Sequence, residues 1–120
     1  MNIHHGSSSS IVRSSLLALL ACAAFGTARL AAAEVAENWS KHCASCHGKD
    51  GKGQTKAGKI SGAKDMTDST YQAGLNDDKM FKSIKEGMKE KGVDIMKPFA
   101  AKLTDDEIKA LIAHVRTLKK

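Results

Sequence analysis

The chain contains one Cys-x-x-Cys pair, Cys43 and Cys46, and a histidine, His47, follows it directly. This pattern predicts covalent attachment of a c-type haem. The two thiols would bond the vinyl groups of the porphyrin, and the imidazole of His47 would bind the iron as its proximal ligand. Residues three and four apart share one face of a helix, so a single helical turn can present all three groups to one cofactor.

The second axial position of such an iron needs a ligand from another segment, and we favour Met96. It lies in residues 93–103, which we expect to be irregular because they hold Pro98, the only proline of the chain. Two alternatives stay open. Met88 falls on an apolar helical stripe and is expected in the core, and His114 lies at the margin of the last apolar helix face.

Residues 1–33 have the pattern of a secretory leader. An apolar run over 16–25 is followed by three alanines at 31–33, so we expect cleavage before Glu34 and a mature chain in the periplasm or an equivalent extracytoplasmic compartment. The run is shorter than the roughly 20 residues that a membrane span needs, and we expect no stable span. An uncleaved anchor is one alternative, and lipid attachment through Cys22 is another.

Residues 34–120 are expected to form one domain of 87 residues, which is small for a hydrophobic core alone. A covalently held apolar cofactor would supply the missing core. The whole chain has a formal charge of +6, and loss of Arg13 and Arg29 with the leader leaves +4. This mild excess, without aromatic residues in a basic patch, argues against nucleic acid. It fits weak steering toward the acidic face of a redox protein.

The predicted helices span residues 34–47, 76–88 and 104–118. Trp39 is expected in the core of the first helix, Asn76 is a good N-cap for the second, and Thr104 with Glu107 forms a capping box for the third. Residues 48–70, rich in glycine and lysine, are expected to be a loop, whose lysines form either a solvated surface or a docking rim. We find no strand pattern, so the predicted class is all-α.

With these features the chain resembles the class I c-type cytochromes, the small monohaem electron carriers of the bacterial cell envelope. The resemblance covers residues 34–120. Residues 43–53 are similar to the family's haem motif and the glycine-rich loop after it, and residues 95–108 to its distal-methionine loop and last helix. It implies a cytochrome c fold, with three main helices wrapped around one covalently bound haem c and the first and last helices crossing. It also implies His47 and Met96 as iron ligands.

The chain departs from this family at two positions. Many members carry Gly-Pro where a backbone carbonyl accepts the proton of the proximal histidine, and this chain has Gly58 and Lys59 there. Either carbonyl remains a candidate acceptor, without the rigidity of proline. Many members have tyrosine at the position of His114, so the resemblance implies an interhelical contact for this residue.

The resemblance implies one-electron transfer between redox proteins by a monomer. With both axial positions filled by protein, the iron has no open site for a substrate, and we therefore predict no enzyme. A haem-based sensor or peroxidase-like enzyme is the alternative if the sixth ligand is labile. A thiol oxidoreductase would need a βαβ pattern around Cys43 and Cys46, which is absent, and a zinc site would need further ligands near them.

Overall fold

The computed structural model describes residues 29–120. By its internal contacts the chain divides after Ala33 into two units, of which the second, Glu34–Lys120, contains the Cys-x-x-Cys-His motif. The apolar run of the predicted leader and Cys22 lie outside the described residues, so cleavage and lipid anchoring stay predictions. Among residues 29–120 no helix is both long and apolar enough to span a bilayer.

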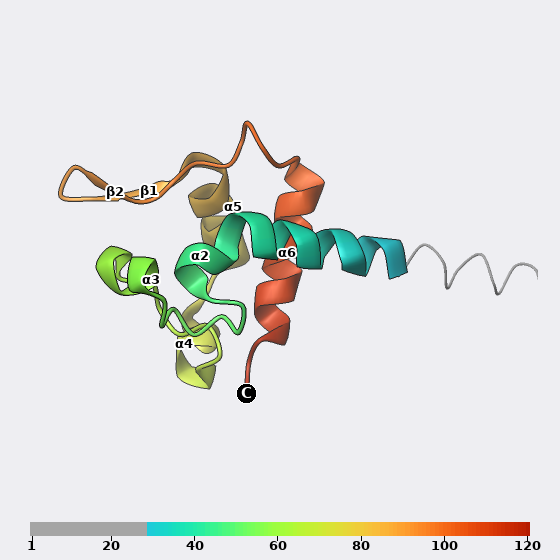
Figure 1. The fold of residues 1–120 in the computed structure, drawn as a ribbon, viewed down its shortest axis with the longest axis horizontal. Helices are drawn as coiled ribbons and strands as arrows, with labels where there is room; N and C mark the ends of the chain where they lie inside the picture. The colour runs from blue at the N-terminus through green and yellow to red at the C-terminus, as the bar shows by residue number, and fades with distance from the viewer. Residues whose placement is uncertain (1–28) are drawn as a thin grey trace, which may run out of the picture. The chain divides into compact units, whose positions relative to one another are not determined.

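The first helical segment carries the motif at its end. Residues 29–38 are α-helical, a π-helical turn η1 (Trp39–Cys43) follows, and α2 (Ala44–His47) completes the segment (Figure 1). Gly48, at φ 81°, ends it, because a positive φ suits glycine better than other residues. The predicted helix over 34–47 is confirmed, except that a π turn precedes the second half of the motif. Such turns are frequent at functional sites.

Two short helices occupy part of the region that was expected to be a loop. Helix α3 (Lys56–Ser61) begins after Thr55, and α4 (Ser69–Gly74) begins after Asp68; each of these side chains accepts a backbone hydrogen bond from the first turn. The loop prediction for residues 48–70 was therefore wrong in part. Each helix has only six residues. That is too short for a recognisable apolar stripe, and local capping marks their beginnings.

Helix α5 (Asp77–Glu86) begins after Asn76, whose side chain caps it as predicted. It ends at Gly87, which has a φ of 79°. The sequence had predicted that this helix continues to Met88. Gly87, in an extended conformation with positive φ, ends the helix at Glu86, two residues earlier, so the apolar stripe stops at the preceding turn.

An antiparallel hairpin follows instead. Strand β1 (Met88–Glu90) pairs with β2 (Val93–Met96). Lys91 and Gly92 join the strands with φ values of 49° and 82°, and two positive values are what the commonest two-residue hairpin turn requires. The expectation of no strand and of an irregular segment from residue 93 was wrong here, although the described chain is mostly helical, as predicted.

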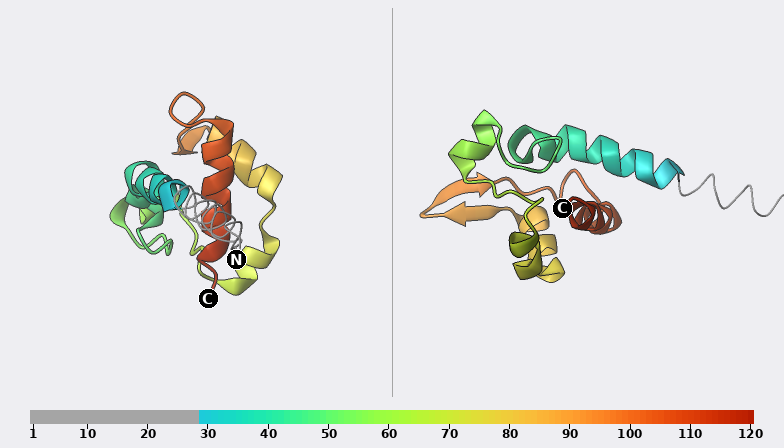
Figure 2. Two further views of the ribbon diagram at one scale, coloured as in Figure 1. Left: turned by 90° about the vertical axis from the view of Figure 1, so that its right-hand side faces the viewer. Right: turned by 90° about the horizontal axis from the view of Figure 1, so that it is seen from below.

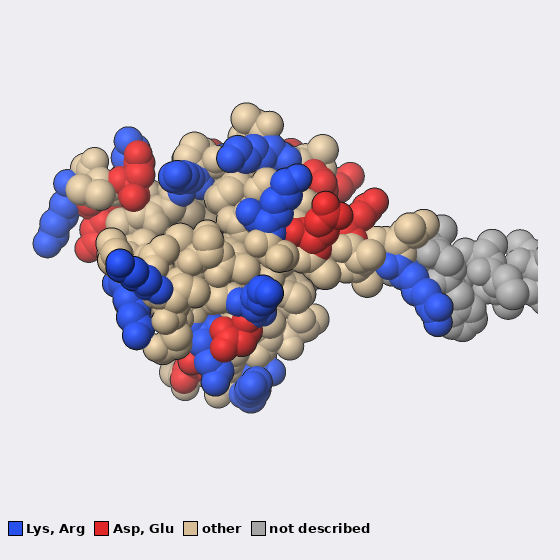
Figure 3. All heavy atoms as spheres, in the orientation of Figure 1, with Lys and Arg blue, Asp and Glu red and all other residues tan. Residues whose placement is uncertain are grey.

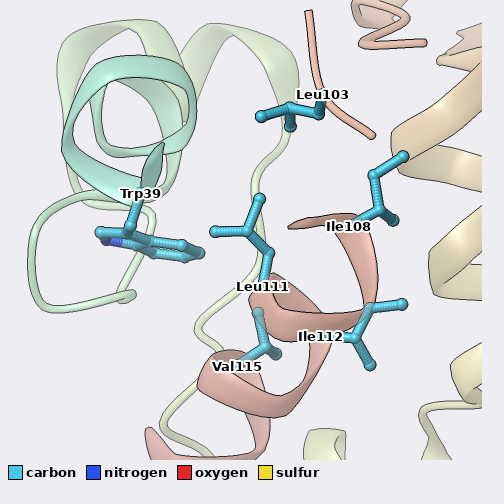
Figure 4. Close-up of a cluster of buried hydrophobic side chains, with 6 residues drawn as sticks. All are labelled: Trp39, Leu103, Ile108, Leu111, Ile112 and Val115. Atoms are coloured by element: carbon cyan, nitrogen blue, oxygen red, sulfur yellow. The ribbon is translucent and has the colours of Figure 1, made fainter. Parts of the chain in front are cut away.

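The last helix, α6 (Asp105–Thr117), is capped as predicted. The Thr104 amide donates to the Glu107 carboxylate at 2.7 Å, and the Glu107 amide donates to the Thr104 hydroxyl at 3.2 Å. The first helical segment crosses α6 (Figures 1 and 2), as the family resemblance implied. The core that they share contains six buried side chains (Figure 4): Trp39, Leu103, Ile108, Leu111, Ile112 and Val115. The prediction of Trp39 as a core residue is confirmed.

A buried glutamine ties α4 to α6. The side chain of Gln72 is 3% exposed, and its Nε2 donates to the carbonyl oxygens of Met66 and Val115, each at 2.7 Å. The Arg116 guanidinium donates to the Gln72 carbonyl oxygen, also at 2.7 Å. Because a buried carbonyl that loses its partner destabilises the fold, these bonds fix α4 against the last turn of α6.

Candidate haem site

A cavity of about 760 Å³ lies between the end of the first helical segment, α3 and the hairpin. In the right-hand view of Figure 2 the orange hairpin faces the green segment that contains α2 and α3. Cys43, Cys46 and His47 line this cavity, and so does Met96 on β2. The fold thus brings together all four residues that the sequence predicted for the site. The volume falls in the range of ligand and cofactor pockets, about 300–1,000 Å³.

The two thiols are half-buried and unpaired among the described residues. Burial raises the pKa of the Cys43 thiol to about 11. This thiol is therefore protonated at neutral pH, whereas the reactive cysteine of a Cys-x-x-Cys oxidoreductase has a lowered pKa. The raised pKa of the Cys43 thiol thus argues against a thiol–disulfide exchange site.

One ring nitrogen of His47, Nδ1, is buried in the protein. Burial lowers the pKa of His47, which favours the neutral ring that binds a metal. Its Nδ1 is fully buried and has no hydrogen-bond partner among the described residues. Neither candidate acceptor, the carbonyl of Gly58 or that of Lys59, bonds to this nitrogen, and the Gly58 carbonyl oxygen accepts from the Ala63 amide at 2.8 Å. Nε2 is the nitrogen left to bind iron.

The ring of Trp39 lies between two histidines. Its centroid is 6.1 Å from that of His47 and 5.0 Å from that of His114. The indole Nε1 donates to the Gly48 carbonyl oxygen at 3.1 Å, which fixes the residue that follows the motif. His114 is not among the described residues that line the cavity, and its packing on Trp39 is the interhelical contact that the resemblance implied.

The hairpin presents two thioethers to the cavity. Met88 and Met96 face each other across the strands and both line the cavity. Met88 is 43% exposed, so the prediction that it belongs to the core was wrong. The error follows from the early end of α5, which removes Met88 from the helical stripe. Met80, on the same predicted stripe, does pack against the core.

Two thiols, a neutral imidazole and thioethers from a separate segment therefore line one cavity. These are the groups that attach haem c and ligate its iron. The buried Nδ1 of His47 leaves its other nitrogen for the metal. The residues present fit haem c.

The rim of the cavity carries both basic and acidic side chains. Lys64 and Lys97 line it, together with Glu90 and Asp94 of the hairpin. Lys89 pairs with Asp94 at 3.2 Å across the strands. Figure 3 shows basic side chains over α3 and side chains of both charges over the hairpin. The rim thus carries lysines on both sides of the cavity, Lys64 after α3 and Lys97 after β2, and its two carboxylates lie on the hairpin.

Sequence reasoning missed several cavity residues. Tyr71 of α4 and Phe99 line the cavity, and the Phe99 ring lies 5.8 Å from that of His42, centroid to centroid. Thr55 was also missed, although its hydroxyl contacts the carbonyl oxygens of Ser45 and Cys46. The N-cap signals of Thr55 and of the residue before α4 could have placed these short helices, but not their tertiary contacts.

Comparison with known proteins identifies the family. Residues 30–115 match the family model described as cytochrome C oxidase, cbb3-type, subunit III. The solved structure of the KustC0563 c-type cytochrome is 36% identical, covers 71% of this chain and 96% of its own, and superposes with a TM-score of 0.61. A point mutant of that protein is 37% identical, covers 72% of this chain and 99% of its own, and has a TM-score of 0.63. No curated protein matches the chain.

The family model matches most of the chain, the solved relatives are 36–37% identical, and one cavity is lined by the four predicted site residues. These three findings agree with one another. The chain belongs to the c-type cytochrome family, whose members hold haem c covalently and carry electrons.

Proposed function

We propose that this protein is a monohaem, one-electron carrier whose iron is ligated by His47 and Met96. The observation that carries the proposal is the single cavity lined by both thiols, the imidazole and Met96. Family membership supports the cofactor and the electron-carrying role. The ligand pair, the presence of one haem and the cycling between two oxidation states are the parts that we propose.

In this proposal the two cysteines attach the haem, and His47 and Met96 bind its iron. Cys43 and Cys46 bond the two vinyl groups through their sulfurs, so the cofactor cannot dissociate. When bound, haem c supplies an iron that exchanges one electron between Fe(III) and Fe(II). His47 would bind this iron through its imidazole. Met96 would bind it through a neutral thioether, which would favour Fe(II) and raise the reduction potential. With both ligands bound, the iron would have no open site for a substrate, so we expect the protein not to be an enzyme.

One observation favours a second candidate, a haem-based sensor or peroxidase-like enzyme. Every residue of β1 is exposed, and Met96 is held on the strand that pairs with it. A two-stranded hairpin is only marginally stable by itself. If the hairpin opens, the thioether leaves the iron and a small ligand can enter. Carbon monoxide binding to the reduced protein distinguishes this candidate from the carrier.

The electron partners in this proposal are redox proteins with an acidic docking face. Lys64 and Lys97 line the cavity, and Lys56 and Lys59 lie exposed on α3 next to it. Charges of this kind steer a partner and are screened by salt. We therefore expect the rate of electron exchange with an acidic partner to fall as ionic strength rises. A rate that rises with salt would contradict an acidic partner face.

The proposed location is the periplasm or an equivalent compartment outside the cytoplasm. It rests on the leader pattern in residues 1–33 and on cleavage before Glu34, with a monomeric product. N-terminal sequencing of the exported protein tests it. A first residue at Glu34 is expected, and a lipid-modified N-terminus at Cys22 would favour the membrane-anchored alternative.

Covalent attachment is tested by the mass of the denatured protein. The expected chain retains the mass of one haem after acid extraction, and variants that replace Cys43 and Cys46 together by alanine do not. Replacement of Ser45, the exposed residue between the two cysteines, by alanine is the matched control and keeps the haem. Release of the haem from the unaltered chain on acid extraction would refute the attachment.

A further inference from the structure

The hydroxyl of Thr55 holds the turn that carries the attachment motif. Its Oγ1 lies 2.8 Å from the Ser45 carbonyl oxygen and 3.0 Å from that of Cys46, and these two oxygens share its one hydroxyl proton. The same oxygen accepts from the Gly58 amide at 2.9 Å. One side chain therefore joins the end of α2 to the beginning of α3.

These bonds complete the hydrogen bonding of α2. A helix leaves its last four carbonyl groups without partners inside the helix, and α2 has four residues. The Ala44 carbonyl accepts from the Gly48 amide at 2.9 Å, and the His47 carbonyl accepts from the Gly53 amide at 2.8 Å. The two carbonyls between them, at Ser45 and Cys46, are the ones that Thr55 serves. Loss of its hydroxyl would leave both without their side-chain donor.

Close packing at Gly58 reinforces the link. A Cβ at this position would overlap the Cys46 carbonyl oxygen and would lie 2.7 Å from the Gly53 carbonyl oxygen. Only glycine lets the backbone of α3 approach the motif this closely. The Thr55 hydroxyl bonds and this contact meet at the same carbonyl group, that of the second attachment cysteine.

We propose that Thr55 is a positioning residue for the haem, one that fixes the orientation of Cys46 and His47 toward the cavity. The inference rests on the proposed function, since it concerns how the proximal ligand is held. It assigns Thr55 no contact with the cofactor itself.

The test compares three variants of the haem-bound protein. Thr55→Val has nearly the same shape without the hydroxyl, and Thr55→Ser keeps the hydroxyl. Thr117→Val is the matched control, because the Thr117 hydroxyl also donates to a backbone carbonyl, that of His114, at an exposed site away from the cavity. The readouts are amide hydrogen exchange at Gly58 and the reduction potential.

For Thr55→Val we expect exchange at Gly58 to be about fivefold faster or more, the factor that corresponds to one lost hydrogen bond. We also expect a lower reduction potential, since a looser turn admits water, which stabilises the extra charge of Fe(III). Thr55→Ser should restore both readouts, and Thr117→Val should change neither. Failure of Thr55→Val to mature, with full recovery in Thr55→Ser, would support the same assignment.

Equal behaviour of Thr55→Val and Thr55→Ser in both readouts would overturn the inference. The haem content of the unaltered protein is measured first by mass. If haem is not covalently bound, the proposed function fails, and exchange at Gly58 in the haem-free chain still decides whether Thr55 holds the turn.

Discussion

Met88 and Met96 stand directly opposite each other on the two strands of the hairpin, and both reach the cavity that holds the cysteines and His47. Opposite residues of an antiparallel pair project from the same face of the sheet. Two thioethers are thus available on one side of the proposed haem. They differ in burial, since Met96 is half-buried and Met88 is 43% exposed. This difference favours Met96 as the ligand.

Replacement of Met96 by alanine should abolish the weak sulfur-to-iron band at the red end of the visible spectrum of the oxidised protein. It should also lower the reduction potential, because a neutral thioether favours Fe(II). Met88→Ala should keep the band. Met80→Ala serves as a control, because Met80 packs against the core and does not line the cavity. Loss of the band in Met88→Ala with survival in Met96→Ala would assign the ligand to Met88.

Replacement of Gln72 by leucine should lower the free energy of unfolding by about 1–3 kcal/mol. Leucine has a similar volume but offers no donor to the Met66 and Val115 carbonyl oxygens. Chemical denaturation of the holoprotein measures the effect. Gln54→Leu, at an exposed glutamine, is the matched control and should stay within about 0.5 kcal/mol of the parent. Equal effects of the two substitutions would rule out a structural role for the Gln72 amide.

Glu107 should make the stability of the protein depend on pH in acid. Hydrogen bonds from the Thr104 amide, and then from the Asn38 side chain, hold the pKa of Glu107 below its ordinary value of 4.5. A carboxylate with a lowered folded-state pKa stabilises the fold above the unfolded-state pKa, and this contribution is lost as pH falls through the folded-state value. We expect Glu107→Gln to be less stable than the parent at pH 7, with a difference that shrinks below pH 4.5.

Denaturation of both proteins across this pH range measures that difference. Asp106→Asn is the control, because Asp106 is an exposed carboxylate on the same turn, bonded only to Lys109 among the described residues. If the difference in free energy of unfolding between Glu107→Gln and the parent stayed constant from pH 7 into acid, ionisation of Glu107 would not contribute to the pH dependence of stability.

The sequence predicted those parts of the site and fold that depend on short patterns of neighbouring residues. The motif at Cys43 to His47 has fixed spacing, and the helix that begins after Thr104 has both halves of its capping box within four residues. The buried face of α6 follows from apolar residues at helical spacing. In each case the information lies within one or two helical turns, so no knowledge of the tertiary fold was needed.

The hairpin could not be predicted in the same way. Its strands are short, and its exposed faces give no alternation of apolar and polar residues. Its turn is Lys91-Gly92 rather than the common Asn-Gly or Asp-Gly signal. By residue spacing alone, the apolar stripe of α5 would continue through Met88. The conformation of Gly87 ends the helix before that residue.

Contacts between distant segments also escaped prediction. The bonds of Thr55 to the carbonyls of Ser45 and Cys46 join residues nine and ten apart through the fold of a loop. The bond of Gln72 to Val115 spans 43 residues. The sequence does not indicate which buried carbonyl a polar residue in a loop or short helix will bond, because that depends on how the helices pack.

The most direct test of the carrier proposal is the visible spectrum of the native protein, oxidised and reduced, with and without carbon monoxide. Closed ligation by His47 and Met96 predicts a c-type haem spectrum, the sulfur-to-iron band in the oxidised form, and a reduced spectrum that carbon monoxide does not promptly change. A reduced spectrum that shifts at once on addition of carbon monoxide would show an open or labile sixth position and would contradict the electron-carrier assignment.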